Sequence, residues 1–144
     1  ECDCPPNTEG SFCETKIPVG LEITSVAYEA IFGFSFCLNG SAPGNTDLEV
    51  RILENGSVID TDRASLTSLS FPDATFFVDA VLDDPNGTYT LEIWRECSDP
   101  GDPRHGFRID DLDFVPIDFY QRDNISFFDV GFGGIGVTGS WIFD

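Results

Sequence analysis

Basic side chains and histidine are scarce in this sequence of 144 residues. It has 7 Lys and Arg against 26 Asp and Glu, a single His, and a net charge of −19 at pH 7. So acidic a chain repels nucleic acid and anionic membrane surfaces, which excludes both as partners. Because small domains usually carry a net charge of about 2–8 in magnitude, this one needs screening salt, bound cations or a basic partner. An acidic surface selected for solubility and a specific calcium site both remain open.

Long apolar runs are also missing. No segment approaches the roughly 20 residues that span a bilayer, and no stretch has the pattern of a signal peptide. Since the sequence begins at Glu1 without a methionine, we expect a mature or excised product. Disorder is excluded in turn, because 41% of the residues are hydrophobic and 14 are phenylalanine. These residues suffice for the core of one domain with a small appendage.

The five cysteines indicate the redox compartment in which the protein is found. Three crowd the first thirteen residues, and the other two lie far apart on predicted strands. His105 is the only histidine, which argues against a zinc site. We therefore expect disulfides and an extracellular or cell-surface location. The cysteines are Cys2, Cys4, Cys13, Cys37 and Cys97.

Four of the six asparagines begin an Asn-x-Ser/Thr sequon, where chance predicts roughly one. Three of the four are also Asn-Gly pairs, which favour type I′ hairpin turns. Turn chemistry explains each pair but not the hydroxyl residue that follows it. The pattern favours a secreted N-glycoprotein. The predicted glycosylation sites are Asn39, Asn55, Asn86 and Asn124.

Period-2 alternation predicts strands along most of the chain, and no segment has a helical pattern. The clearest strand is 89–97, with Tyr89, Leu91, Ile93 and Cys97 on one face. The pair Asn55-Gly56 joins strand 47–54 to strand 57–61 as a hairpin. Strands separated by turn signals every 8–12 residues or so indicate an all-β, antiparallel two-sheet β-sandwich.

Three further segments carry specific expectations. Leu21–Ala30 alternates, with Leu21, Ile23 and Ser25 on one side. The segment 74–82 is nearly continuous in apolar residues, which predicts a strand buried on both faces. The segment 117–122 is predicted to be another strand.

The segment 1–15 resembles the last third of an EGF-like module, which ends in C-x-C-x8-C with proline, glycine and an aromatic residue in the final loop. The resemblance implies a Cys4–Cys13 disulfide and a partner for Cys2 upstream of this chain. A disulfide-stapled tail with a free Cys2 is the alternative. The segment 16–20 is predicted to be a linker.

The segment 21–116 resembles the jelly-roll sandwiches of MAM domains and carbohydrate-binding modules. The last strand in those families often reads I-D-D-hydrophobic-x-F, as Ile109–Phe114 does here. The resemblance implies an extracellular adhesion, assembly or glycan-binding module, often with calcium. The segment 117–144 holds the last strands of this sandwich, a donor strand for a neighbour, or the start of a following domain.

Cys37 and Cys97 each end a predicted strand and lie about sixty residues apart. Two such residues can meet in a two-sheet fold, and the implied Cys4–Cys13 pair leaves them no other partner. A Cys37–Cys97 disulfide would stabilise the fold by roughly 3–4 kcal/mol on the loop-entropy estimate.

Calcium and glycans are the candidate ligands. Asp110, Asp111 and Asp113, with the loop residues Asp99 and Asp102, offer the oxygen donors that calcium prefers. Alternation divides the first three between the two faces of the strand unless the strand bulges. The alternative is that these aspartates only keep an edge of the sheet soluble. Trp94 lies on the polar face of its strand, where it can stack on a sugar or contact a neighbouring module.

The sequence therefore predicts a non-enzymatic, extracellular structural or adhesive glycoprotein module. We expect it to assemble with copies of itself or with neighbouring modules into a filament or matrix, through β-strand or sandwich contacts. A glycan-binding, lectin-like module is the alternative. No spacing among the acidic residues singles out a catalytic pair.

Overall fold

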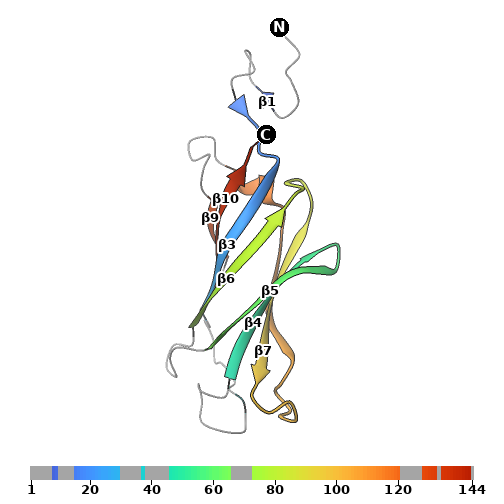
Figure 1. Cartoon of the computed structure of the whole chain (residues 1–144), viewed down its shortest axis with the longest axis vertical. Helices are drawn as coiled ribbons and strands as arrows, with labels where there is room; N and C mark the ends of the chain where they lie inside the picture. Colours follow the sequence, from blue (N-terminus) through green and yellow to red (C-terminus); the bar gives the residue numbers. More distant parts are fainter. Residues whose placement is uncertain are drawn as a thin grey trace.

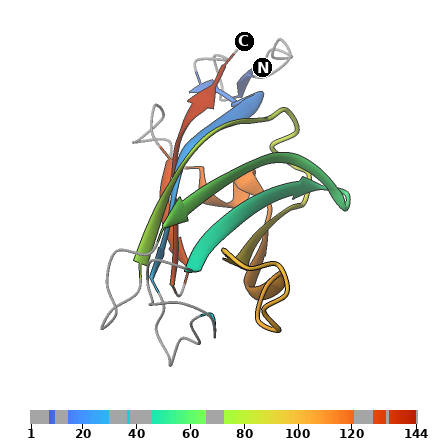
Figure 2. The same ribbon diagram turned by 60° about the horizontal axis from the view of Figure 1, so that its bottom comes forward.

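The chain is an antiparallel two-sheet β-sandwich, as the sequence predicts (Figures 1 and 2). The structure is a computed structural model that describes residues 8–9, 15–29, 37, 46–65, 73–120, 128–132 and 134–143. Within these ranges, no helix has the length and hydropathy of a membrane span.

Two four-stranded sheets form the sandwich. The β3 sheet has the order β6 (Asp73–Leu82), β3 (Gly20–Glu29), β10 (Ile135–Ile142) and β9 (Phe128–Phe132). The β7 sheet has the order β5 (Ser57–Ser65), β4 (Thr46–Glu54), β7 (Tyr89–Cys97) and β8 (Phe107–Phe114). A 3-10 helix, η1 (Pro116–Phe119), follows β8, and β1 (Thr8–Glu9) pairs with β2 (Thr15–Lys16) near the start of β3 (Figure 1).

Alternate residues of both sheets face inward and form one core. On the predicted face of β7, Tyr89, Leu91 and Ile93 are fully buried. Cross-strand partners share that face, so Ile52 of β4 meets Leu91 and Val50 meets Ile93. Each such aliphatic side chain contributes about 1.5–3 kcal/mol on burial, which makes this layer the main source of stability.

The buried face of β3 changes phase partway along the strand. Leu21 and Ile23 are buried as predicted, but the pairing with both neighbouring strands shifts between Ile23 and Ser25. A bulge adds one residue and exchanges the two faces beyond it. Val26 and Tyr28 are therefore buried, and the prediction that Ser25 continues the inner face is wrong.

The prediction that 74–82 is buried on both faces is also wrong. β6 alternates strictly between exposed and buried residues along its length. The sandwich has two layers, so only the face of β6 that points toward the β7 sheet meets the core. Phe76 points into that core, while 77% of Phe77 is exposed on the outer face.

The end of the chain belongs to this same sandwich. β10 lies between β3 and β9, and it buries Ile135, Val137 and Trp141 in the core. Residues 135–139 are thus paired with β9 on one side and β3 on the other, and residues 140–142 are paired with β3. The strand predicted at 117–122 is corrected at its start, where η1 replaces it.

The seam between β5 and β6 is closed by side chains. The two edge strands lie side by side (Figure 2), and no ladder joins their sheets in the described part of the chain. Asp62 Oδ2 accepts a hydrogen bond from Phe77 N at 2.9 Å, and Asp60 Oδ2 accepts one from Asp79 N at 3.1 Å. These two carboxylates thereby accept the hydrogen bonds of two backbone N–H groups that an edge strand would otherwise offer to another chain.

Replacing both carboxylates is expected to open this seam. Asp60→Ala/Asp62→Ala leaves the amides of Phe77 and Asp79 without these acceptors. We expect a loss of about 2 kcal/mol, since both bonds are solvent-exposed, together with aggregation on warming. Urea unfolding and light scattering measure the two effects. Asp111→Ala, on the edge strand β8, is the matched control and should change neither; equal behaviour of the two variants would refute the seam's role.

Candidate functional site

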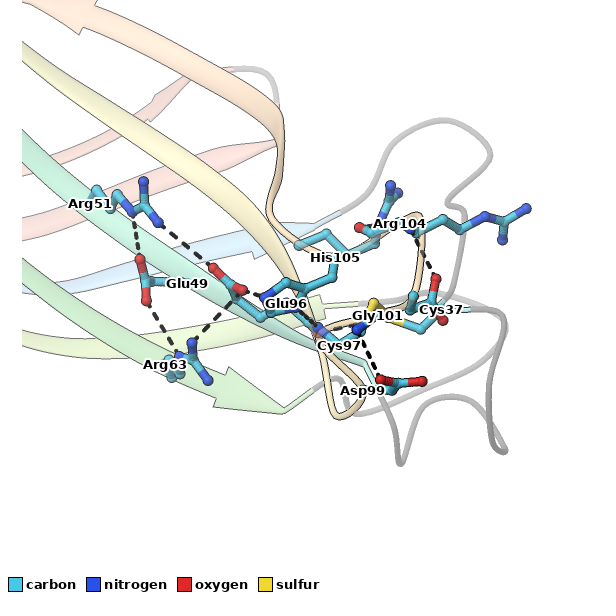
Figure 3. A network of polar contacts seen from close by, with 12 residues as sticks. Cys37, Glu49, Arg51, Arg63, Glu96, Cys97, Asp99, Gly101, Arg104 and His105 are labelled. Carbon is cyan, nitrogen blue, oxygen red and sulfur yellow. Dashed lines mark hydrogen bonds and ion pairs between the residues drawn. A yellow bond between two sulfur atoms is a disulfide. The ribbon is translucent and has the colours of Figure 1, made fainter.

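The predicted disulfide between Cys37 and Cys97 is present, with a Cα–Cα distance of 5.8 Å (Figure 3). The amide N–H of Cys37 donates to Thr46 Oγ1 at 2.9 Å, and Thr46 is fully buried. The disulfide therefore attaches the chain before β4 to the end of β7. Cys2, Cys4 and Cys13 lie outside the described residues.

The loop after Cys97 is held by its own aspartates. Asp99 Oδ1 accepts from Gly101 N at 2.9 Å, and Asp102 Oδ1 accepts from Arg104 N at 2.9 Å. Asp102 is buried, and one of its carboxylate oxygens lies within 4.8 Å of the sulfur atoms of Cys37 and Cys97. Because metals bind the thiolate form of cysteine, the disulfide excludes this group as a metal site.

A buried carboxylate, Glu96, organises the outer face of the β7 sheet near the disulfide (Figure 3). The Nη2 atoms of Arg51 and Arg63 lie 3.7 and 3.8 Å from its oxygens. Glu49 joins the same two arginines, at 2.5 Å from Arg51 Nε and 3.4 Å from Arg63 Nε. A buried carboxylate is tolerated when it is paired in this way. We therefore interpret the cluster as structural.

His105 serves this network as a hydrogen-bond acceptor. The amide N–H of Cys97 donates to His105 Nδ1 at 2.9 Å. The same Nδ1 atom lies 3.4 Å from Glu96 Oε2. His105 thus fixes the loop against β7.

Trp94, the predicted glycan platform, is engaged by its neighbours. The Arg51 guanidinium lies 4.1 Å from the centre of its ring, and Nε1 donates to Glu92 Oε1 at 3.1 Å. Glu92 also accepts from Arg108 Nη1 at 3.0 Å. Arg51 occupies a ring face that a sugar would need for stacking. Glycan binding at Trp94 stays a prediction.

The predicted calcium ligands do not converge on one point. Residues paired across strands share a face, so Asp110 points inward with Ile93, while Asp111 and Asp113 point outward. The bulge in the pairing lies before Asp110 and does not reunite them. Thr90 Oγ1 also donates to Asp113 Oδ1 at 2.7 Å. The three aspartates therefore do not surround one calcium ion together, which needs six to eight oxygens, and calcium binding stays a prediction.

Asp110 instead acts on the core beside it. Burial raises the pKa of the Tyr28 hydroxyl above its ordinary value, and the negative charge of Asp110 raises it further. Both causes disfavour the phenolate. Tyr28 therefore stays neutral in the core.

Two of the predicted glycosylation sites lie at exposed turns. Asn55 and Gly56 join β4 to β5, with φ values of 51° and 81°. Positive φ at both positions is the type I′ geometry that the Asn-Gly pair predicts. Asn86 lies in the turn before β7, where its backbone N–H donates to Asp84 Oδ1 at 3.1 Å. Both side chains are exposed, while Asn39 and Asn124 lie outside the described residues.

The outer face of the β3 sheet carries exposed apolar side chains. Phe77 is 77% exposed and Val81 is 52% exposed, both on β6. Small side chains flank the aromatic ring, because Ser25 of β3 is paired with Phe77 and Thr138 of β10 is paired with Ser25. An exposed aromatic residue on such a face is typical of a contact surface.

Sequence reasoning did not identify this face. Its signal was the adjacent pair Phe76-Phe77, since alternation must send one of the two outward. No protein-family profile matches the chain, and no curated protein matches it significantly. The fold defines the class, an all-β sandwich with a disulfide between Cys37 and the end of β7, and the resemblances to EGF-like and MAM modules remain predictions.

Proposed function

We propose that this chain is a non-enzymatic, extracellular structural or adhesive module that assembles with copies of itself into a filament or matrix. The observation that carries the proposal is the exposure of Phe77 and Val81 on the outer face of the β3 sheet. An exposed phenylalanine loses unfavourable hydration when a partner covers it, and aromatic residues anchor many protein interfaces. The disulfide supports an extracellular location.

The arrangement of the strands favours contact through faces of the sandwich over donation of a strand. Residues 135–139 of β10 are paired with both β3 and β9 inside their own sheet, so this part of the strand is not available to a neighbour. The edges of β5 and β6 are occupied by Asp60 and Asp62. The edge strand β8 carries three aspartates and a bulge, both of which discourage edge pairing.

Phe77→Ser is expected to weaken self-association without unfolding the chain. Removing an aromatic anchor costs about 2 kcal/mol or more at an interface, which is about thirtyfold in Kd. Sedimentation velocity over a concentration series in 0.15 M salt measures the effect. The melting temperature should hardly change, because the side chain is exposed.

Phe77→Tyr is the matched control. It keeps the ring and adds a hydroxyl that reaches water, so it should associate nearly as the natural chain does. A natural chain that stays monomeric at every concentration would contradict the proposed function, as would a Phe77→Ser variant that associates normally.

A further inference from the structure

The two outer faces of the sandwich differ in whether they present cationic side chains. None of the described residues of β3, β6, β9 and β10 is Lys or Arg. The outer face of the β3 sheet instead has acidic side chains around its apolar residues. These are Glu22, Glu29, Asp73 and Asp79.

All the described arginines belong to the β7 sheet or to the loop between β7 and β8. On the outer face of that sheet, guanidinium groups lie above shielded carboxylates. The side chain of Arg63 is 58% exposed and that of Arg108 is 51% exposed. Their partners Glu49, Glu92 and Glu96 are nearly covered, with exposures of 14%, 12% and 6%. Here the guanidinium groups are more exposed than their carboxylate partners, although Asp111 and Asp113 of β8 also point outward and interact with Arg108.

Arg108 retains hydrogen-bonding capacity for such a molecule. Its described hydrogen bond to Glu92 runs through Nη1, whereas a guanidinium carries five N–H donors. A carboxylate from a partner can bind it in the bidentate manner that arginine favours.

We propose that copies of this chain associate head to tail, with the acidic, apolar outer face of the β3 sheet of one copy seated on the arginine-bearing outer face of the β7 sheet of the next. This inference rests on the proposed function and names its partner and interface. Contact between two β3-sheet faces would instead oppose the same four acidic side chains of both copies. Like charges so placed disfavour that arrangement, while carboxylates opposite guanidiniums favour the mixed one.

The geometry of a sandwich sets the outcome of this contact. The two faces lie on opposite sides of the molecule (Figure 2). A heterologous contact between opposite sides repeats along one direction and gives an open filament unless its rotation closes a ring. At 0.15 M salt, charges more than about 8 Å apart are largely screened, so that local pairing outweighs the net charge of −19.

Mixing two defective variants tests the arrangement. Phe77→Ser damages the β3-sheet face, and Arg108→Glu damages the β7-sheet face at an exposed position. Each variant alone should associate at least tenfold more weakly than the natural chain. In a 1:1 mixture, the intact β7-sheet face of the first variant meets the intact β3-sheet face of the second, which restores one natural contact. Native mass spectrometry and sedimentation velocity should show a heterodimer with the natural Kd and no larger species.

The possible failures are distinguishable. If Phe77→Ser weakens association while Arg108→Glu does not, or if the mixture stays monomeric, the head-to-tail contact is wrong and the proposed function stands. A natural chain that never associates overturns both and leaves a separate basic protein as the occupant of the β3-sheet face. Arg108→Gln, which adds no negative charge beside Glu92, repeats the test if Arg108→Glu lowers the melting temperature.

Discussion

Replacing Cys37 and Cys97 with serine is expected to lower the free energy of unfolding by about 4 kcal/mol. The disulfide closes a loop with a sequence separation of 60 residues, and cross-linking a loop of that length removes roughly this much free energy from the unfolded chain. Two features of the folded state add to the effect. Both cysteines are buried, and Cys37 holds the hydrogen bond to Thr46 at the start of β4.

Urea unfolding of the double variant at pH 7 measures this loss, and a change below about 1 kcal/mol would show that the bond contributes little. Cys37→Ala/Cys97→Ala is the matched control. It breaks the same bond without burying two hydroxyl groups, so the difference between the two double variants isolates the cost of those groups. Loss of the disulfide should also release His105 from the end of β7, because His105 Nδ1 accepts a hydrogen bond from the backbone N–H of Cys97.

Gly139→Ala is expected to destabilise the fold by about 3 kcal/mol, the upper part of the usual range for overpacking. A Cβ at position 139 would overlap with the carbonyl oxygen of Glu22 and would lie 3.2 Å from the Cα of Ile23. These are backbone atoms of the strand β3, which is paired with neighbours on both sides and cannot move aside easily. The clash coincides with the bulge that sets the phase of β3.

Gly136→Ala provides the control on the same strand. A Cβ there meets the Cβ of Ala27 at 4.0 Å, an ordinary van der Waals contact. We expect this variant to melt within a few degrees of the natural chain, while Gly139→Ala melts well below it or fails to fold. Equal stability of the two variants would show that β3 and β10 separate to admit the methyl group.

Head-to-tail association would also explain why so acidic a chain keeps its arginines together. Arg51 and Arg63 hold the buried Glu96, which accounts for their position in the free chain. Arg108 has only an exposed ion pair with Glu92, and such pairs contribute little to stability. A role in contact with the next copy gives that residue a function which its own fold does not require.

Local patterns in the sequence were sufficient for the β7 sheet. Alternation in β4 and β7 predicted which of their apolar residues face the core, because both strands lie inside a sheet with one face on the core. The Asn55-Gly56 pair predicted its hairpin, since positive φ at both positions is a property of those two residues alone. The Cys37–Cys97 disulfide followed from two strand ends in a two-sheet fold.

Tertiary structure decided the rest, because each missed feature depends on a neighbour distant in the chain. The apolar segment of β6 resembles a strand covered on both faces, but it lies in a two-layer sandwich, and the outer face of its sheet leaves Phe77 exposed. The phase change in β3 arises where Gly139 lets β10 approach Glu22. Glu96 is buried because Arg51 and Arg63 come from two other strands. The sequence by itself determined most of the strands and the Asn55-Gly56 hairpin, which depend on local geometry. The positions of the cysteines, together with the implied Cys4–Cys13 pair, predicted the Cys37–Cys97 disulfide. The pairing of strands determined which side chains remain on the surface, and hence which face is available to a partner.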